Sequence, residues 1–259
     1  MSPREARRGV AGVAGVAVCL AVLETLGRTG LIDPLLLPLA STVVAGTARL
    51  AIDPDFLADA GHTLLACGCG LLIAVAVAVP AGLLLGTVPA VESALRPLIE
   101  FLRPIPSVAL IPLALFLFTD GTQAKVALIV FTASWPLLIN TMYGLREVDP
   151  VAKDTLRSFG FGPLAVVVRV SLPSAAPFVV TGVRISASVA LIVAVSVELV
   201  AGGAGIGAFL GDAAAGNQRD AMLAAVVWTG VIGLTVNTLL VTAEHRLFGR
   251  RHAGAGEVR

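Results

Sequence analysis

The sequence predicts an all-α integral membrane protein with about six transmembrane helices. Hydrophobic residues make up 57% of its 259 residues, and the mean hydropathy is +0.93. Charged residues make up only 14%, whereas a soluble domain carries about 25%. The apolar residues also gather in long runs, and a helix needs a run of about 20 to cross the hydrocarbon core of a bilayer.

Six apolar runs are the expected spans, and together they form one transmembrane domain over residues 10–245. Backbone polar groups inside a bilayer need partners within the protein, so such runs are expected to be helices. The third run is short and rich in proline. The expected spans are residues 10–26, 63–85, 104–118, 126–142, 177–200 and 222–242.

The distribution of Lys and Arg predicts the orientation of the spans. With residues 1–9 in the cytoplasm, 13 of the 18 basic residues fall in cytoplasmic segments, four fall in outer segments, and Arg184 lies inside the fifth span. Cytoplasmic loops of membrane proteins carry such an excess. Both termini, including the tail of residues 246–259, are therefore expected on the cytoplasmic side of a multi-pass cell membrane protein.

The first run also shares the plan of a secretory signal peptide, in which basic residues precede an apolar stretch. No clear small-residue cleavage site follows it, and the next apolar run starts only near Thr63. We therefore expect a retained first helix. The outer stretch 27–62, which contains prolines and acidic residues, is expected to be partly helical.

Composition also disfavours several classes of function. A net charge of +1 gives no reason to expect nucleic acid as a partner. The three cysteines lie in apolar runs, where free cysteine behaves as a small buried hydrophobe, and the three histidines have no second ligand nearby, so no metal or cofactor is expected. A P-loop needs Lys beside Ser or Thr after a glycine loop. Neither Lys125 nor Lys153 fits, so the chain is not expected to be an enzyme that hydrolyses ATP.

The most informative segment is the cytoplasmic stretch 146–176. Asp149 and Pro150 form a helix start, because they supply an acceptor at the cap and a fixed φ at the first helical position. Gly160 is expected to end this amphipathic helix. A second short helix over residues 164–171 follows, and Leu172-Pro173 is expected to close it.

This pair of helices predicts an element that docks an apolar face into a partner's groove. The alternative is a solvated linker that only joins two spans. A linker of that kind has no need of an amphipathic pattern or of sharp helix ends.

The segment resembles the EAA loop of ABC importer permeases. That loop carries Glu-Ala-Ala, three further residues, Gly, and then about eleven residues to a Leu-Pro pair. In this chain the triplet reads Asp-Thr-Leu, in which Asp keeps the charge with a shorter reach, and Thr and Leu are bulkier than Ala. The positions that the resemblance assigns to ATPase coupling are Asp154, Thr155, Leu156, Gly160, Leu172 and Pro173.

Flanking segments resemble the nitrate/sulfonate/taurine branch of the same family. Residues 102–116 (LRPIPSVALIPLALF) resemble its Arg-Pro-x-Pro-x-x-Ala-x-x-Pro-Leu stretch. Residues 139–150 (INTMYGLREVDP) resemble its Asn-Thr-x-x-Gly-Leu-x-x-Val-Asp-Pro, and residues 197–210 (VELVAGGAGIGAFL) resemble its Glu-Leu and Gly-Leu-Gly ending, slightly altered. The resemblance covers roughly residues 60–245.

The resemblance implies a type I ABC importer permease-like fold and a set of partners. These are a cytoplasmic ABC ATPase dimer, an extracytoplasmic solute-binding protein and a second permease subunit, most simply in a homodimer. The implied substrates are small anions such as nitrate, sulfonate or taurine, or a vitamin precursor.

Four polar residues within the spans are candidates for the translocation pathway. Glu198 is an intramembrane carboxylate, which indicates function unless it only reaches the membrane interface. Arg184 suits an anionic substrate or, as the favoured alternative, lipid headgroups. Asn140 and Ser134 either line a polar path or make hydrogen bonds between helices.

Two other classes of function compete with a permease subunit. An ion-coupled secondary transporter or channel is expected to show buried paired charges or broken helices repeated in two halves, and the sequence indicates neither. A membrane-embedded enzyme needs His, Asp or Glu gathered at one membrane face, and none converge in the sequence.

Overall fold

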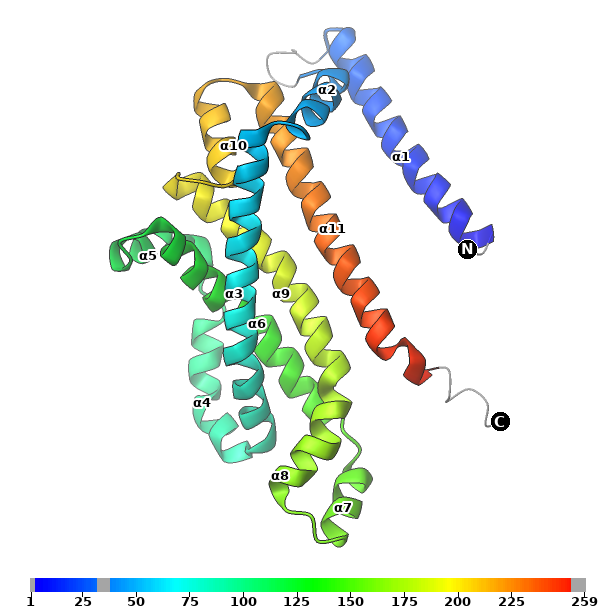
Figure 1. The fold of residues 1–259 in the computed structure, drawn as a ribbon, viewed down its shortest axis with the longest axis vertical. Helices are drawn as coiled ribbons and strands as arrows, with labels where there is room; N and C mark the ends of the chain where they lie inside the picture. Colours follow the sequence, from blue (N-terminus) through cyan, green and yellow to red (C-terminus); the bar gives the residue numbers. More distant parts are fainter. Residues whose placement is uncertain (1–2, 32–37, 253–259) are drawn as a thin grey trace.

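The computed structural model describes residues 3–31 and 38–252, and these residues form a helical bundle without strands (Figure 1). The long helices are α1 (Pro3–Arg28), α3 (Pro54–Thr87), α6 (Gly121–Arg146), α9 (Leu172–Ala201) and α11 (Arg219–His252). The shorter elements are α2 (Ala40–Leu50), α4 (Pro89–Leu102), the 3₁₀ turn η1 (Ser107–Leu110), α5 (Ile111–Leu117), α7 (Pro150–Ser158), α8 (Pro163–Val166), the π turn η2 (Val167–Ser171) and α10 (Ile206–Ala215).

Two ends of the bundle are distinguished by their short helices. We name the end with α2 and α10 the outer end, and the end with α7 and α8 the inner end, following the orientation predicted from the basic residues. Helix α1 meets α2 and otherwise stands apart from the other helices (Figure 1).

Four helices of the described residues are long and apolar enough to cross a membrane. They cover Pro54–Thr87, Gly121–Arg146, Pro163–Ala201 and Arg219–Arg246. Each contains one of the predicted spans 63–85, 126–142, 177–200 and 222–242. The first predicted span lies in α1, which is not one of these four. The count of six spans and the positions of the termini therefore stay predictions.

The third predicted span, residues 104–118, is not a single short helix in the structure. Its helical part, Ser107–Leu117, is the second arm of a pair whose first arm is Pro89–Leu102, and the two arms are bent by 81°. Pro104 and Pro106 lie between the arms. Because proline has no N–H and its ring crowds the preceding turn, the helix cannot continue through them.

The expectation that Leu172-Pro173 closes a short helix is wrong. The chain is helical without a break from Pro163 to Ala201. The five residues before Leu172 form the π turn η2, and the N–H of Leu172 bonds the carbonyl of Val167. A π turn shifts the hydrogen-bond register by one residue, and this shift lets a proline sit at the start of α9 without ending the helix. The described cysteines also differ from expectation, because Cys19 and Cys69 are exposed and Cys67 is only partly buried.

The centre of the bundle is made by α3, α6 and α9, which pack along most of their lengths. Small residues at intervals of four line the face of α3 toward its neighbours, and they let the backbones approach closely. These residues are Ala66, Gly70, Ala74, Ala78 and Gly82. At Gly82 an added Cβ would lie 2.7 Å from the Cβ of Thr141 and 3.1 Å from the carbonyl oxygen of Leu138.

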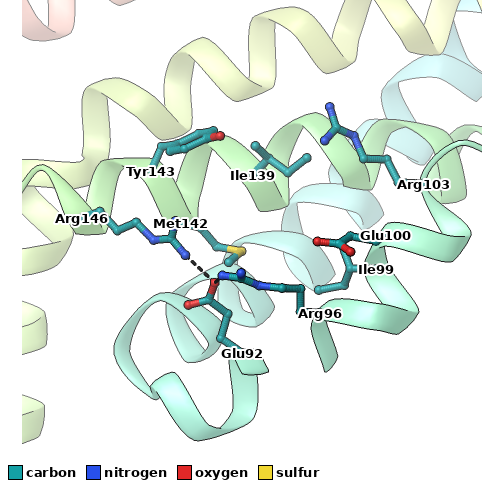
Figure 2. A pocket seen from close by; sticks show the side chains of 9 residues that line it. All are labelled: Glu92, Arg96, Ile99, Glu100, Arg103, Ile139, Met142, Tyr143 and Arg146. Carbon is teal, nitrogen blue, oxygen red and sulfur yellow. Dashed lines mark hydrogen bonds and ion pairs between the residues drawn. The ribbon is translucent and has the colours of Figure 1, made fainter. Parts of the chain in front are cut away.

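At the inner end, α4 runs back beside α3, and a cavity of about 200 Å³ opens between α4 and α6 (Figure 2). Its walls carry several charged side chains. Helix α7 and helix α8 lie farther along, beyond the inner ends of α6 and α9 (Figure 1).

Replacing Gly82 by leucine is expected to lower the free energy of unfolding by about 1–3 kcal/mol, because the side chain overpacks the contact between α3 and α6. The matched control is Gly68→Leu on the same helix, where an added Cβ meets nothing within 4 Å. Thermal unfolding of both variants in detergent provides the measurement. Equal losses at the two positions would show that close approach of α3 and α6 is not what Gly82 provides.

Candidate functional site

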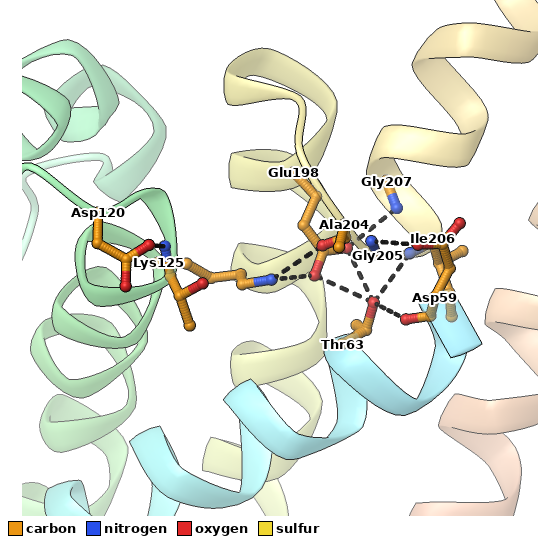
Figure 3. Close-up of polar contacts among 10 residues, drawn as sticks. Asp59, Thr63, Asp120, Lys125, Glu198, Ala204, Gly205, Ile206 and Gly207 are labelled. Atoms are coloured by element: carbon orange, nitrogen blue, oxygen red, sulfur yellow. Dashed lines mark hydrogen bonds and ion pairs between the residues drawn. The ribbon is translucent and has the colours of Figure 1, made fainter. Parts of the chain in front are cut away.

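A buried ion pair joins α6 and α9 at the outer end of the bundle. Glu198, near the end of α9, is 2% exposed, and Lys125, in the first turns of α6, is 5% exposed. The Nζ atom of Lys125 lies 2.7 Å from Oε1 of Glu198. Figure 3 shows the two side chains reaching toward each other from their helices. A buried charge is stable only when it is paired and hydrogen-bonded, and this pair meets the first condition.

Hydrogen bonds from α3 and α10 complete the surroundings of the Glu198 carboxylate. The Thr63 hydroxyl, from α3, lies 3.0 Å from Oε1 and 2.9 Å from Oε2 and donates to this carboxylate. The backbone N–H of Gly207 donates to Oε2 at 3.0 Å. The Thr63 oxygen in turn accepts from the N–H of Ile206 at 2.9 Å. Every oxygen of the carboxylate therefore has a donor, and the second condition is met.

The same side chains hold the segment between α9 and α10, residues 202–205, which we name the outer glycine loop. Lys125 donates from Nζ to the carbonyl of Ala204 at 3.3 Å, and Asp59 accepts from the N–H of Gly205 at 2.8 Å (Figure 3). Gly205 has φ +137°, and a Cβ there would lie 2.2 Å from Cδ of Glu198. The carboxylate thus occupies space that only a glycine leaves open.

A cavity of about 150 Å³ lies beside this ion pair. It is bordered by the start of α6, by the end of α9 and by the outer glycine loop, and both Lys125 and Glu198 are among its lining residues. Ionisable residues inside membrane-spanning segments are rare, and they mark ion or substrate pathways or charged moving parts. The arrangement can therefore link a buried charge to the position of a loop at the outer end.

The structure places the other predicted pathway residues elsewhere in the bundle. Arg184 is part-buried and lies 3.4 Å, from Nη1 to Oε2, from Glu244 of α11, and a role toward an anionic substrate or lipid headgroups stays a prediction. Asn140 donates from Nδ2 to the carbonyl of Pro136 at 2.8 Å. Ser134 donates to the carbonyl of Val130 at 2.6 Å. The last two bonds are within α6, and a pathway role for these residues stays a prediction.

Sequence reasoning missed Lys125 and Thr63 as partners of Glu198, and it missed Asp59 as the acceptor for the N–H of Gly205. The expectation that the chain has no buried paired charges is wrong, because Lys125 and Glu198 form such a pair. Lys125 was expected in an outer segment, and it lies in the first turns of α6, at the outer end of the bundle. The available signal was the solitary lysine at the start of one apolar run and the solitary glutamate at the end of another, which antiparallel packing brings to the same end.

The second candidate site is the inner hairpin, which we define as α7, the turn after it and α8. Asp149 caps α7 by accepting from the N–H of Val151 at 2.8 Å, with Pro150 at the first helical position, as predicted. Gly160 has φ +81°, a left-handed conformation that ends a helix at little cost only in glycine. The guanidinium of Arg169 lies 4.7 Å from the ring centroid of Phe161 and closes the turn against the following helix.

The residues that the resemblance assigns to coupling all lie in or beside the inner hairpin. Asp154 pairs with Arg157 at 3.0 Å, Thr155 donates to the carbonyl of Val151, and Leu156 is half-buried. Leu172 and Pro173 begin α9 directly after η2. The hairpin also exposes large apolar side chains, which are Val151 at 69%, Phe159 at 78% and Leu164 at 77%.

Comparison with known proteins assigns the family. Residues 78–253 match the family described as the binding-protein-dependent transport system inner membrane component. The chain belongs to this family. Its description as an inner membrane component, together with the long apolar helices, confirms the prediction of a multi-pass membrane protein. It also confirms the resemblance from which the sequence prediction started.

Relatives with named functions include transport permeases for several solutes. A nitrate import permease protein, NrtB, of Leptolyngbya laminosa is 30% identical over 66% of this chain and 61% of that protein. A putative ABC transporter permease protein of Methanocaldococcus jannaschii is 33% identical over 69% of this chain and 67% of that protein. The taurine transport system permease protein TauC of Escherichia coli is 28% identical over 93% and 90%. This chain thus matches about three fifths of the length of the nitrate relative.

Solved structures confirm the fold. A chain of the MetNI methionine ABC transporter in an inward-facing conformation superposes with a TM-score of 0.64 at 18% identity, over 71% of this chain and 92% of that one. A chain of an amino acid ABC transporter with histidines gives 0.63 at 20% identity, over 77% and 97%. The predicted all-α, type I ABC importer permease-like fold is therefore correct.

Replacing Lys125 by methionine is expected to lower the free energy of unfolding by about 3–5 kcal/mol, because it leaves the buried Glu198 carboxylate without a cation. The double variant with Glu198→Gln is expected to lose less than the sum of the single losses, with a coupling of about 1–3 kcal/mol. Thermal unfolding of the four proteins in detergent measures this cycle.

The control is the same cycle at Arg184 and Glu244, with Gln at both positions. Their side chains are 35% and 23% exposed, and a pair this open is expected to couple by less than about 1 kcal/mol. Strict additivity at Lys125 and Glu198 would show that the two charges do not depend on each other.

Proposed function

We propose that the chain is the membrane permease subunit of an ABC importer, which forms the translocation pathway and couples to a separate ATPase. Family membership supports this proposal. The observation that carries it is the inner hairpin, whose first helix is capped by Asp149 and which exposes Val151, Phe159 and Leu164 at the inner end of the bundle. Exposed apolar side chains on an amphipathic element suit docking into a partner's groove.

The partner at this hairpin is a cytoplasmic ABC ATPase, and the coupling residues are those of the EAA-like loop. Asp154 and Arg157 lie at the rim of the apolar side chains, where charges set specificity and association rate more than affinity. An extracytoplasmic solute-binding protein delivers substrate to the outer end. A second copy of the permease completes the pathway, because one bundle of this size encloses little space.

Coupling between the two ends is supported by one continuous helix. The helical stretch from Pro163 to Ala201 contains 39 residues, which corresponds to roughly 60 Å at 1.5 Å per residue. It begins in the inner hairpin and carries Glu198 near its far end. A displacement of the hairpin on ATP binding therefore moves the outer ion pair and the outer glycine loop, as expected for a shift between two packings of the bundle.

The substrate is a small anion such as nitrate, sulfonate or taurine, or a vitamin precursor. The names of relatives support this class, because they include permeases for nitrate, bicarbonate, aliphatic sulfonates and taurine. Selectivity within the class rests largely with the binding protein, which meets the solute first.

An ion-coupled secondary transporter is the second candidate, and the buried pair of Lys125 and Glu198 is the observation that favours it. Proton or ion coupling uses intramembrane carboxylates of this kind. The exposed inner hairpin has no purpose in such a protein. Uptake into proteoliposomes separates the two functions, because a permease subunit requires ATP and its ATPase, whereas a secondary transporter requires only an ion gradient.

The variants Phe159→Glu and Leu164→Glu are expected to abolish co-purification of a P-loop ATPase, because each buries a charge in the docking surface. The measurement is affinity purification from native membranes, with mass spectrometry of the bound proteins. Both side chains are exposed in the isolated subunit, so folding is expected to be unchanged.

The matched control is Ile52→Glu, an equally exposed apolar side chain, at 79%, between α2 and α3 at the outer end. It is expected to retain the ATPase. If the inner variants retain it as fully as the control does, the hairpin is not the coupling element. Retention of ATP-driven uptake by those variants would lead to the same conclusion.

A further inference from the structure

A line of charged residues runs along one face of α4 toward the middle of the bundle. Glu92, Arg96, Glu100 and Arg103 are spaced by four, four and three residues, which places them on one side of a helix. Three apolar side chains on the rest of the helix are exposed, namely Leu95 at 40%, Leu98 at 52% and Phe101 at 69%. Helix α4 therefore turns its charged face toward α6 and an apolar face outward.

This charged face borders the cavity of about 200 Å³ between α4 and α6 (Figure 2). The opposite wall is the inner half of α6, which contributes Ile139, Met142, Tyr143 and Arg146. The volume is below the roughly 300–1,000 Å³ of sites for drug-sized ligands. The cavity therefore suits a small solute and not a large one.

The cavity is lined by more guanidinium groups than carboxylates, and one of the carboxylates is already fully paired. Glu92 accepts from Arg96 at 2.8 Å and also from Arg146. Figure 2 shows these three side chains as one cluster, with Arg103 standing apart from it. Arg103 makes no ion pair with any residue that the structure describes. Three guanidinium groups thus face two carboxylates, and the exposed guanidinium of Arg103 has no acceptor among the residues that the structure describes.

The position of Arg103 requires an explanation in a membrane protein. It lies at the end of α4 that is farther from the inner end, eleven residues or roughly 16 Å along the helix from Glu92. If α4 and α5 form one broken span, a charged side chain between them is expected to face water-filled space, protein or a ligand and not lipid. A guanidinium presents five N–H donors in a planar fork, which matches the oxygens of planar or tetrahedral oxyanions.

We propose that the cavity between α4 and α6 binds a small oxyanion, with Arg103 as its principal contact and the Tyr143 hydroxyl as a further donor. The inference deepens the proposed function and rests on it for its role, because a solute that has crossed the outer half of the pathway meets this cavity before it reaches the cytoplasm. The Glu92 cluster holds α4 against α6 and forms the inner wall of the cavity. Glu100 opposes the anion and limits its affinity, which favours release.

Anion binding is measured by isothermal titration calorimetry on the intact transporter complex in phosphatidylcholine nanodiscs, without ATP and without the binding protein. The probes are nitrate and methanesulfonate, with chloride keeping the ionic strength constant. Wild type is expected to bind at least one probe saturably, and Arg103→Gln is expected to bind it at least about tenfold more weakly, because a charge-assisted hydrogen bond is lost.

Two further variants protect the test against loss of folding. Glu100→Gln is expected to bind the probe more tightly, and a misfolded protein cannot gain affinity. Arg49→Gln, a matched change on α2 at the outer end, is expected to bind as wild type does. Nanodiscs that contain phosphatidylglycerol distinguish the source of the ligand: weaker probe binding identifies a lipid headgroup phosphate as the natural occupant, and unchanged binding identifies a soluble anion.

The absence of saturable binding to wild type, or equal affinity of wild type and Arg103→Gln, would overturn the inference. Weaker binding to Glu100→Gln would also overturn it, since the carboxylate would then hold a cationic group of the ligand. ATP-driven import without anion binding would refute the cavity site and leave the permease function standing. Anion binding by a protein that imports nothing with its ATPase would do the reverse.

Discussion

The arrangement of the helices at the outer end depends on the need to pair and hydrogen-bond the buried Glu198 carboxylate. A charge that is 2% exposed is tolerable only with a counter-charge and with donors on both oxygens. These partners come from α6, from α3 and from the first turn of α10. Four elements must therefore converge on one carboxylate. The outer glycine loop takes its shape from the same requirement, because Gly205 leaves the space that the carboxyl group fills.

The same buried carboxylate fixes the outer end of the long helix α9. Helix α9 is anchored at its outer end by a charge that cannot be left unpaired, and its other end continues through the π turn η2 into the inner hairpin. Small residues let α3 pack closely on α6, and these two helices are the main neighbours of α9. In the proposed coupling, motion at one end would reach the other through this continuous helix, whose π turn and interior Pro177 are the places where it can bend.

Features that depend on residues close in sequence could be predicted, and contacts between residues far apart in sequence could not. The Asp149 cap and the Gly160 turn depend on neighbours within a few residues, so their residue types predicted the inner hairpin correctly. Thr63 and Glu198 are 135 residues apart, and no periodicity relates them, so only packing revealed the network. Proline misled in one place and informed in another. Pro173 was expected to end a helix that a π turn instead carries through, whereas Pro104 and Pro106 do mark a break, whose 81° angle the pattern could not supply.

That corner between α4 and η1 has a bearing on how the protein sits among lipids. At the corner the regular series of backbone hydrogen bonds is interrupted, and the two prolines contribute no N–H. Nearby carbonyl groups therefore need hydrogen-bond donors from outside the helix. Hydrocarbon chains offer none, and irregular backbone at membrane depth persists only against protein or water. The corner therefore restricts how the bundle can be rotated about its long axis within the membrane. Its irregular backbone is expected to face protein or water and not the acyl chains.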